Sequence, residues 1–498
     1  MSEMPRRWTG ATIEDVTHYV QRGKSPKYVP HSELPVINQK CVRWSGVDEA
    51  HLKYVDPSQW SAWGEERFLR DGDILWNSTG TGTIGRAAIF RGLTTAQRVV
   101  ADSHVTIVRA NGAVLPDYLH RLIQSPSVQS KLDDMQSGST NQVELSKAEV
   151  LATPVPLAPL PEQQRIVAKI DSLTGKSRRA REHLDHIPRL VEKYKQAVLA
   201  AAFRGDLTRE WRRRYGDIAP VAHEMALQRA ELAQKYRQKH YDCNEVFVAN
   251  GSEPFAVPTA WNWVRAEAIC GFITKGTTPH ASQLQSGTGD VPFIKVYNLT
   301  FDGSLNFTVE PTFVSRSTHE GFLARSRVLP NDVLMNIVGP PLGKVSIVPS
   351  DAPEWNINQA IAVFRTIPSV SAAFLAKWLL ADDLVQWGVS RSKATAGQSN
   401  LTLAICRDLP IPLCSLREQQ QITRRIDTAF TWIDRLASEA TNAHKLIDHL
   451  DQAVLVKAFR GELIPQDPDD EPASVLLDRI RAERGAAPKG NQGRTKQS

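Results

Sequence analysis

Two groups of basic and polar residues lie in short loops of the two halves of this 498-residue chain. Lysine and arginine bind phosphates and guanine, while asparagine and glutamine can grip adenine through two hydrogen bonds. The first group is Arg22, Lys24, Ser25, Lys27, Ser78, Thr79, Ser139, Asn141 and Gln142. The second group is Lys275, Thr277, Thr278, Lys344, Arg391, Lys393, Gln398 and Asn400. Any one of these residues also suits an ordinary surface loop, but the two sets together favour the reading of two different short DNA sequences.

A glycine loop in the first half has the spacing of a dinucleotide-binding turn. Residues 80–85 read GTGTIG, they follow a strand-like run, and Asp102 lies about where a ribose-binding acid is expected. The corresponding residues 339–343 of the second half contain two prolines, and a β-like run follows Gly85 where a helix should begin. We therefore predict a β-turn loop rather than a nucleotide site.

Other catalytic and metal-binding patterns are missing from the sequence. The 13 histidines form no HExxH motif, and no phosphate-binding P-loop occurs. The five cysteines form no CxxC pair, so the sequence indicates neither a zinc site nor a disulfide framework. Residues 339–342 (GPPL) also lack the amide and the aromatic residue of the tetrad used by DNA-adenine methyltransferases. We expect a chain without catalytic residues, metal ligands or a bound cofactor.

The elements that must position the loops are arranged around a stretch that the chain contains twice. Residues 160–164 read LPEQQ, and residues 416–420, which follow 256 positions later, read LREQQ. The same offset relates residues 202–207 (AFRGDL) to residues 458–463 (AFRGEL). Two unrelated amphipathic helices are the alternative, but ungapped identity at both ends favours a duplication.

Within each copy, apolar residues recur at alternating steps of four and three, which is the a/d rhythm of a coiled coil. The predicted core-facing series are Ile166, Ile170, Leu173, Ser177, Ala180, Leu184, Ile187, Val191, Tyr194, Val198 and Ile422, Ile426, Ala429, Ile433, Leu436, Ala440, Ala443, Ile447, Leu450, Val454. Each copy predicts a helix of roughly 40 residues, ~60 Å long at 1.5 Å per residue. Pro188 should kink the first helix. We expect the two helices to pack on each other.

The segments that precede the two helices are related more distantly. Pro5-x-x-Trp8 corresponds to Pro258-x-x-Trp261, and further strand-like matches follow in the same order. Short β-branched runs alternate with turn residues, and helical patterns occupy residues 116–135 and 372–387. The predicted fold class is α+β, with two pseudo-symmetric mixed α/β domains joined by two long antiparallel coiled-coil helices. The predicted segments are 1–159, 160–207, 208–257, 258–415, 416–464 and 465–498.

Composition limits the possible partners and compartments. The net charge of +6 and the pI near 9.0 are compatible with a polyanion without requiring one. The basic residues 209–215 (REWRRRY) could contact DNA phosphates, although such a run is more often a solvated face or a protein contact. No signal-peptide core or run of 18 apolar residues occurs, so we expect a cytoplasmic protein without a membrane segment. Residues 485–498 are expected to be disordered.

With these motifs in place, the chain resembles the specificity (S) subunits of type I restriction–modification enzymes. The resemblance covers about residues 5–484 and rests on PLPEQQRI opening the first helix and AFRG-acid-Leu closing both. It departs from the family at Leu416-Arg417, where Leu-Pro is usual, and at residues 339–343, which replace the glycine loop.

The resemblance implies a non-catalytic adaptor. Each recognition domain would read one half of a split, asymmetric duplex DNA site. Two methyltransferase (M) subunits would bind along the helices, and two restriction (R) subunits would join the full complex. S-adenosylmethionine, ATP and Mg would belong to those partners. Candidate partner-binding residues in the repeated motifs are Glu162, Gln163, Gln164, Phe203, Arg204, Glu418, Gln419, Gln420, Phe459 and Arg460.

Two other function classes remain open from the sequence. One is a coiled-coil scaffold whose end domains bind a carbohydrate or a protein instead of DNA. The other is a NAD-dependent enzyme built on residues 80–85. Salt-sensitive binding to one split duplex would separate DNA recognition from the scaffold, and retention of a dinucleotide would support the enzyme.

Overall fold

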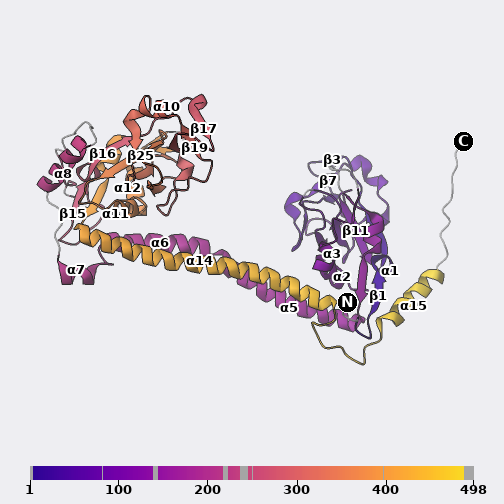
Figure 1. The fold of residues 1–498 in the computed structure, drawn as a ribbon. Helices are drawn as coiled ribbons and strands as arrows, with labels where there is room; N and C mark the ends of the chain where they lie inside the picture. The colour runs from indigo at the N-terminus through magenta and orange to yellow at the C-terminus, as the bar shows by residue number, and fades with distance from the viewer. Residues whose placement is uncertain are drawn as a thin grey trace. The chain divides into compact units, whose positions relative to one another are not determined.

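The computed structural model describes residues 4–80, 82–137, 144–216, 222–235, 245–249, 251–395 and 398–486. The chain divides into two compact units. Unit 1 consists of Met1–Asp185 and Thr441–Ser498, and unit 2 consists of His186–Ala440. Each unit holds one mixed α/β domain, which we call domain 1 (residues 9–157) and domain 2 (residues 262–413), and part of the helical pair (Figure 1).

The centre of each domain is a four-stranded antiparallel sheet. In domain 1 its order is β2 (Thr17–Arg22), β11 (Val105–Ala110), β8 (Ile74–Asn77) and β9 (Ala87–Ile89). In domain 2 its order is β16 (Cys270–Lys275), β25 (Ile361–Thr366), β21 (Val333–Asn336) and β23 (Val345–Ile347). Strand follows strand in the same spatial order, so the duplication inferred from the sequence extends to the topology.

A second sheet in each domain contains one parallel pair. Its order in domain 1 is β10 (Val100–Ala101), β4 (Pro35–Ile37), β7 (Lys53–Val55) and β3 (Tyr28–Val29). Its order in domain 2 is β17 (Leu284–Ser286), β19 (Thr312–Val314), β18 (Val291–Ile294), β24 (Trp355–Ile357) and β20 (Arg327–Val328). The parallel pairs are β10 with β4 and β24 with β18.

Each domain is closed by pairing of its first and last strands. In domain 1, β1 (Thr9–Thr12) pairs with β14 (Pro154–Leu157), and in domain 2, β15 (Asn262–Arg265) pairs with β28 (Pro410–Leu413). Helices then cover the central sheet with buried apolar faces: α2 (Pro116–Gln124), α3 (Pro126–Gln129) and α4 (Lys147–Ala152) in domain 1, and α11 (Ala372–Leu379), α12 (Asp382–Arg391) and α13 (Leu403–Asp408) in domain 2. The expected α+β domains are confirmed.

A buried ion pair lies in the same place of both central sheets. Arg109 on β11 binds Asp73 through two nitrogens, each 2.7 Å from a carboxylate oxygen. Arg365 on β25 binds Asp332 in the same way at 2.8 and 2.7 Å. Both guanidinium groups also lie over an aromatic ring, Tyr19 at 5.0 Å and Phe272 at 5.1 Å. The bidentate contacts and the ring compensate part of the desolvation of the two charges.

The helical pair has one broken and one continuous member. The first copy forms α5 (Leu160–Asp185, 26 residues) and α6 (Ile187–Phe203, 17 residues), whereas the second forms α14 (Leu416–Phe459, 44 residues). The break at His186 is explained by Pro188, which lies in the first turn of α6 and cannot donate a backbone hydrogen bond. The disturbance of the helix that Pro188 predicts is thus seen as an interruption at His186.

The helices run antiparallel, as ion pairs within each unit show. In unit 1, Arg181 lies 2.8 Å from Asp448, and Asp185 lies 2.9 Å from His444. In unit 2, Lys195 lies 2.6 Å from Asp434. Rising residue numbers on one helix therefore meet falling numbers on the other, and Figure 1 shows α14 lying alongside α5 and α6.

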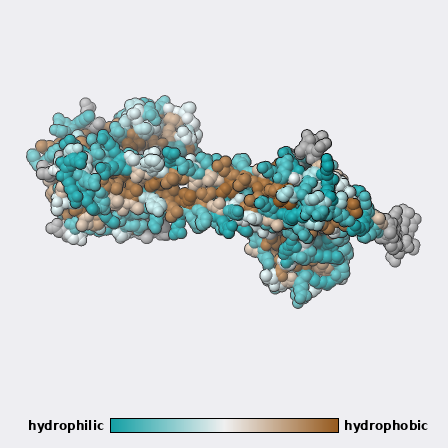
Figure 2. Space-filling model, turned by 90° about the horizontal axis from the view of Figure 1, so that it is seen from below, coloured by the Kyte–Doolittle hydropathy of each residue, from teal (hydrophilic) through white to brown (hydrophobic). Residues whose placement is uncertain are grey.

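The predicted core-facing series is only partly buried. Ile166, Ile170, Ile422 and Ile426 are fully buried near the helix starts, as expected. Tyr194, Leu436 and Leu450 were predicted in the same series, and this was wrong, because each of these side chains is mostly exposed. Two helices alone leave part of the a/d seam uncovered. Figure 2 shows hydrophobic residues exposed along the helices on the face that it draws.

Short amphipathic helices follow each long helix. After α6 come α7 (Arg209–Tyr215) and α8 (Ala222–Lys235), and Met225 of α8 is buried in the core of domain 2. After α14 comes α15 (Ala473–Ala486), whose Leu477 is buried in the core of domain 1. Among the residues that the structure describes, no helix is both long enough and apolar enough to cross a lipid bilayer.

We expect that Arg109→Met will lower the free energy of unfolding by about 3–5 kcal/mol, because the Asp73 carboxylate would remain buried without its cation. Chemical denaturation of the full chain, followed by far-ultraviolet circular dichroism, measures this change. The matched control is Arg98→Met, which removes an exposed ion pair with Glu65 and should cost less than about 1 kcal/mol. Equal losses in the two variants would contradict the assigned role of the buried pair.

Candidate nucleic-acid interface

The loops singled out in the first half meet at one edge of the central sheet of domain 1. Arg22 ends β2, Asn77 ends β8 and Val105 begins β11, and neighbouring strands in this sheet are antiparallel. These three positions therefore lie at the same end of the sheet. We call this edge 1, and it comprises residues 22–28, 78–86, 102–104 and the hairpin of β12 (Gln136–Ser137) and β13 (Glu144–Leu145). The bridge between Thr79 and Glu144 attaches the hairpin to the glycine loop.

Domain 2 builds the corresponding edge 2 from residues 275–278, 338–344, 358–360 and a hairpin. The hairpin strands are β26 (Lys393–Thr395) and β27 (Gln398–Asn400), and β27 pairs with β22 (Val338–Gly339). In both domains the described strands of this hairpin are antiparallel pairs: Gln136–Ser137 with Glu144–Leu145, and Lys393–Thr395 with Gln398–Asn400. Among the described residues, the loops after β2 and β8 lie at one edge in domain 1, and those after β16 and β21 lie at the corresponding edge in domain 2.

One glycine in each edge is needed for close backbone contact. The Gly23 nitrogen donates to the Val105 carbonyl at 2.9 Å, and the Gly276 nitrogen donates to the Ile361 carbonyl at 3.0 Å. A Cβ atom on Gly23 would lie 2.1 Å from the Ala101 oxygen, and one on Gly276 would lie 2.1 Å from the Ile357 oxygen. Only glycine fits at either position, so both edges share one backbone scaffold.

The candidate residues of edge 1 differ in their exposure to solvent. Lys24, Ser25 and Lys27 are exposed, and the Ser25 hydroxyl lies 2.6 Å from the Ser103 hydroxyl, while the Lys27 ammonium lies 2.9 Å from Asp56. Arg22 is partly buried and lies 2.5 Å from Glu144. These four residues can meet a ligand from solvent.

Two other candidates of edge 1 face inward. Ser78 is fully buried and shares a hydrogen bond with the Thr106 hydroxyl, so its side chain supports the sheet and does not reach the surface. Thr79 is nearly buried and shares a hydrogen bond with His104 Nδ1. Ser139, Asn141 and Gln142 lie outside the described residues.

The candidates of edge 2 are also mixed. Lys275 and Arg391 are exposed, and the Arg391 guanidinium lies 4.0 Å from the centre of the Trp387 ring. The Lys344 ammonium lies 5.7 Å from the Phe301 ring. The hydroxyls of Thr277 and Thr278 accept hydrogen bonds from Arg325 at 3.3 Å and from the Gln359 nitrogen at 3.3 Å.

The hairpin of edge 2 is described only in part. Asn400 is half-buried, and its Oδ1 has no hydrogen-bond partner among the described residues. Lys393 and Gln398 are described as backbone positions on β26 and β27, without their side chains. An amide oxygen held out of water without a donor is available to a ligand group that can supply one.

Sequence reasoning missed a difference between the two edges, in which an aspartate of domain 1 corresponds to an asparagine of domain 2. The Asp102 nitrogen donates to the Ile37 carbonyl at 3.0 Å, and the Asn358 nitrogen donates to the Ile294 carbonyl at 3.0 Å. Burial raises the pKa of Asp102, whose carboxylate accepts from the His104 nitrogen at 2.8 Å. One backbone position therefore carries a carboxyl group in domain 1 and an amide in domain 2. Aligning the two parallel strand pairs could have revealed the exchange.

The glycine loop of domain 1 leads into a strand. Thr83 and Ile84 donate to the Gly80 carbonyl at 3.0 Å, which closes a tight turn, and β9 follows directly. A dinucleotide-binding turn requires a helix start here, where backbone N–H groups meet the pyrophosphate. The sequence-based preference for a β-turn loop agrees with this geometry.

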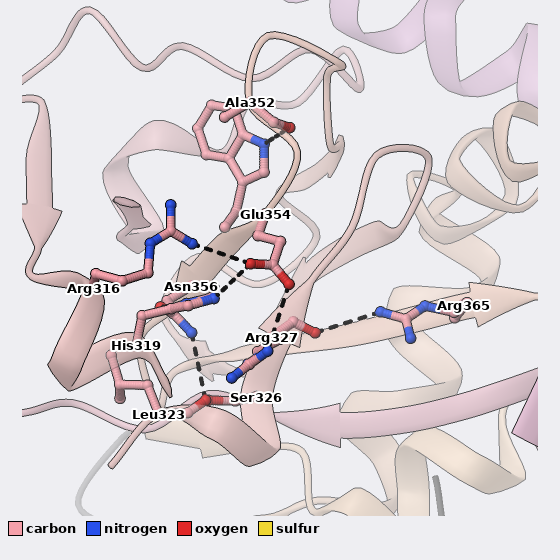
Figure 3. A network of polar contacts seen from close by, with 10 residues as sticks. Arg316, His319, Leu323, Ser326, Arg327, Ala352, Glu354, Asn356 and Arg365 are labelled. Carbon is pink, nitrogen blue, oxygen red and sulfur yellow. Dashed lines mark hydrogen bonds and ion pairs between the residues drawn. The ribbon is translucent and has the colours of Figure 1, made fainter. Parts of the chain in front are cut away.

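Domain 2 contains a polar network that the sequence analysis did not predict (Figure 3). His319 is buried on α10 (Arg316–Glu320) and lies 2.6 Å from the Asn356 Oδ1 and 3.0 Å from a Glu354 oxygen. Arg316 and Arg327 approach the same Glu354 carboxylate at 3.3 and 3.6 Å. These contacts connect α10 and β20 to β24 and so stabilise the second sheet of domain 2.

Six of the ten candidate partner-binding residues are buried within the chain: Glu162, Gln163, Phe203, Glu418, Gln419 and Phe459. Phe203 packs on Trp378 at 4.8 Å, and Phe459 packs on Tyr118 at 5.2 Å. The repeated Ala-Phe-Arg-Gly ends therefore serve as apolar anchors on α11 and α2. Gln164, Arg204, Gln420 and Arg460 are exposed.

The buried glutamines join each long helix to its own domain. Gln163 accepts from the Leu115 nitrogen at 2.8 Å and donates to the Ala113 and Ala158 carbonyls at 3.1 and 2.8 Å. Gln419 accepts from the Ser371 nitrogen at 2.8 Å and donates to the Ser369 and Cys414 carbonyls at 3.2 and 2.9 Å. Each amide thus satisfies backbone groups at the start of α2 or α11, which explains why the motif occurs twice.

The neighbouring glutamates are not equivalent. Glu418 accepts hydrogen bonds from Thr208 at 2.7 Å, from the Trp261 indole at 2.8 Å and from the Arg212 guanidinium. Glu162 is buried, and its Oε1 has no hydrogen-bond partner among the described residues. The positions 256 residues after Thr208 and Arg212 are Ile464 and Pro468, which can neither donate a side-chain hydrogen bond nor supply a charge. Burial raises the pKa of Glu162.

We expect that Glu418→Gln will destabilise unit 2 by about 3–5 kcal/mol, because Arg212 would lose its buried counter-charge. Glu162→Gln should leave stability unchanged or raise it at pH 7. The raised pKa means that ionised Glu162 lowers stability as pH rises, so the benefit of the amide should vanish below about pH 4. Thermal unfolding of both variants between pH 4 and pH 8 measures the difference, and a larger loss for Glu162→Gln would contradict it.

Comparison with known proteins identifies the family of this chain. The family described as the type I restriction modification DNA specificity domain matches residues 5–185 and again residues 258–442. The chain therefore belongs to the DNA-specificity subunits of type I restriction–modification systems. Among the described residues, no cluster of three or more metal-binding side chains occurs.

Individual relatives agree with this family. The EcoBI specificity subunit of Escherichia coli is 30% identical over 359 residues, which cover 69% of this chain and 67% of the relative. The EcoKI specificity subunit of Escherichia coli K12 is 21% identical over 513 residues and 97% of each chain.

Two solved structures share the fold. A chain from a type I R-M system studied for complex assembly and conformational transition aligns with a TM-score of 0.59 at 19% identity, covering 93% of this chain and 100% of the other. The HsdS subunit of Thermoanaerobacter tengcongensis aligns with a TM-score of 0.53 at 19% identity, covering 93% and 98%.

Proposed function

We propose that edges 1 and 2 each read one half of a bipartite, asymmetric duplex DNA site. The observation that carries this proposal is that one backbone scaffold is built twice and presents different side chains. Lys24 follows Gly23 in one copy, and Thr277 follows Gly276 in the other. Two related surfaces with unlike donors and acceptors suit two unlike base sequences. The exposed Lys24, Lys27, Lys275 and Arg391 would contact phosphates or guanine.

In this proposal the chain performs no chemistry of its own. Two methyltransferase subunits dock along the helices, and two restriction subunits join the full complex in the cytoplasm. Those partners bind S-adenosylmethionine, ATP and Mg. The exposed apolar residues of the helical pair, such as Tyr194 and Leu436, support a docking role for the helices.

We expect that Lys275→Ala combined with Lys344→Ala will weaken binding of the chain, in complex with its methyltransferase, to its mapped target. The slope of log K against log salt should become shallower by about 0.9 for each phosphate that the variant no longer neutralises. Discrimination against a scrambled half-site should fall for the half read by domain 2 and persist for the other half. Lys131→Ala, an exposed lysine outside the residue ranges of both edges, is the matched control.

Methylated adenines mapped in a host genome that carries both proteins would identify the target needed for this measurement. The alternative scaffold function would be favoured if the affinity for the split duplex did not change with salt concentration, or did not depend on the sequence of either half-site.

We further propose that the paired helices set the number of unread base pairs between the half-sites. Inserting seven residues into each helix keeps the a/d register and adds about 10 Å at 1.5 Å per residue. The methylated half-sites should then move apart by about three base pairs, at 3.4 Å per step. Seven residues added after Ser498 are the control. An unchanged spacing in a folded, active insertion variant would exclude the helices as the spacer.

A further inference from the structure

Exposed apolar side chains lie along the open part of the helical seam in unit 2. Tyr194 and Leu436 continue the a/d series, yet both are 60% exposed. The contact between Lys195 and Asp434 at 2.6 Å places Tyr194 and Leu436 at the same level of the pair. One turn away on each helix, Leu190 is 45% exposed and Trp432 is 60% exposed. We call these four residues patch A.

The duplication places a related patch in unit 1. Leu446 and Leu450 follow Leu190 and Tyr194 by 256 residues, and they are 67% and 58% exposed. The contact between Arg181 and Asp448 at 2.8 Å places the neighbouring Ala180 level with Leu450. Together with Lys176, these residues form patch B, which is patch A repeated on the other half of the pair.

The two patches differ in the size and polarity of two of their side chains. The residues 256 positions before Trp432 and Leu436 are Lys176 and Ala180. Patch A therefore offers a tryptophan and a leucine where patch B offers a lysine and an alanine. Burying tryptophan and leucine removes far more apolar surface from water than burying alanine and the stem of a lysine.

The seam itself indicates what would cover these patches. An a/d position that two helices leave exposed is covered when a further helix packs against the pair. Because the patches are repeats of each other, they fit the same surface of one partner twice. The occupant is therefore a protein that presents an amphipathic helix and binds in two copies. Within the function proposed above, that partner is the methyltransferase subunit.

Building on that function, we infer that the two methyltransferase copies dock with unequal affinity, the tighter copy on patch A and the weaker copy on patch B. Assembly then proceeds in order, through a complex that carries one methyltransferase on unit 2. A tenfold ratio of the two dissociation constants corresponds to about 1.4 kcal/mol. Burial of a single large apolar side chain is sufficient for that ratio.

Titration of the full chain with its purified methyltransferase subunit, followed by calorimetry and native mass spectrometry, tests this order. We expect two steps whose dissociation constants differ by about tenfold or more. Trp432→Lys combined with Leu436→Ala copies patch B onto patch A, so it should weaken the tighter step and bring the two constants together. Lys176→Trp combined with Ala180→Leu should tighten the weaker step.

Phe322→Lys is the matched control, because Phe322 is an exposed aromatic residue of domain 2 that lies outside the helical pair. It should leave both steps unchanged, and thermal unfolding confirms that each variant is folded. Two equal steps, or a tighter step that survives the patch A variant, would overturn the inference while leaving the docking function intact. Failure of the wild-type chain to bind any methyltransferase would overturn the docking function itself.

Discussion

The structure depends on the hydrogen bonds of two buried amides. Gln163 and Gln419 each bind one backbone nitrogen and two backbone carbonyls where a long helix leaves its domain. Buried backbone groups at such a junction must find partners, and a single side-chain amide supplies both the donors and the acceptor. The direction of each helix is thereby tied to the start of α2 or α11. Without this contact, a domain that reads DNA would have no defined orientation on its helix.

In each domain, the buried residues that repeat between the two domains and the surface residues that differ between them occupy different places. The buried pairs of Arg109 with Asp73 and of Arg365 with Asp332, together with the glycines that admit close backbone contact, repeat between the domains. The side chains on the solvent side of the same edges do not repeat. A surface residue can change with little effect on stability, whereas a buried charge cannot lose its partner cheaply. This separation allows one fold to carry two recognition surfaces.

The two halves are also unequal in their junctions and helical faces. Glu418 is enclosed by three donors, while Glu162 retains a buried oxygen without a partner among the described residues. Trp432 and Leu436 have Lys176 and Ala180 at the matching positions. A duplicated chain that assembles with other proteins is under no constraint to keep both halves identical. Under the inferred docking order, the difference at Trp432 and Leu436 gives one duplicated surface two distinct binding steps.

The sequence alone determined the duplication, the two long helices, the break at Pro188 and the α+β class of both domains. These features depend on local periodicity, on proline chemistry and on an offset that can be read along the chain. The sequence also indicated the loops that lie at the two edges, because basic and polar residues cluster between strand-like runs.

Only the tertiary structure decided which of those residues face solvent. Ser78 and the Glu-Gln pairs are polar. From the sequence alone, a polar residue in a motif is expected to be exposed, because its hydrogen-bond partners inside the protein are not known. Tyr194, Leu436 and Leu450 fit the core rhythm, yet burial depends on how many helices pack together, which periodicity does not specify. The ion pairs of Asp73 with Arg109 and of Asp332 with Arg365 join residues far apart in the chain, so no local pattern could reveal them.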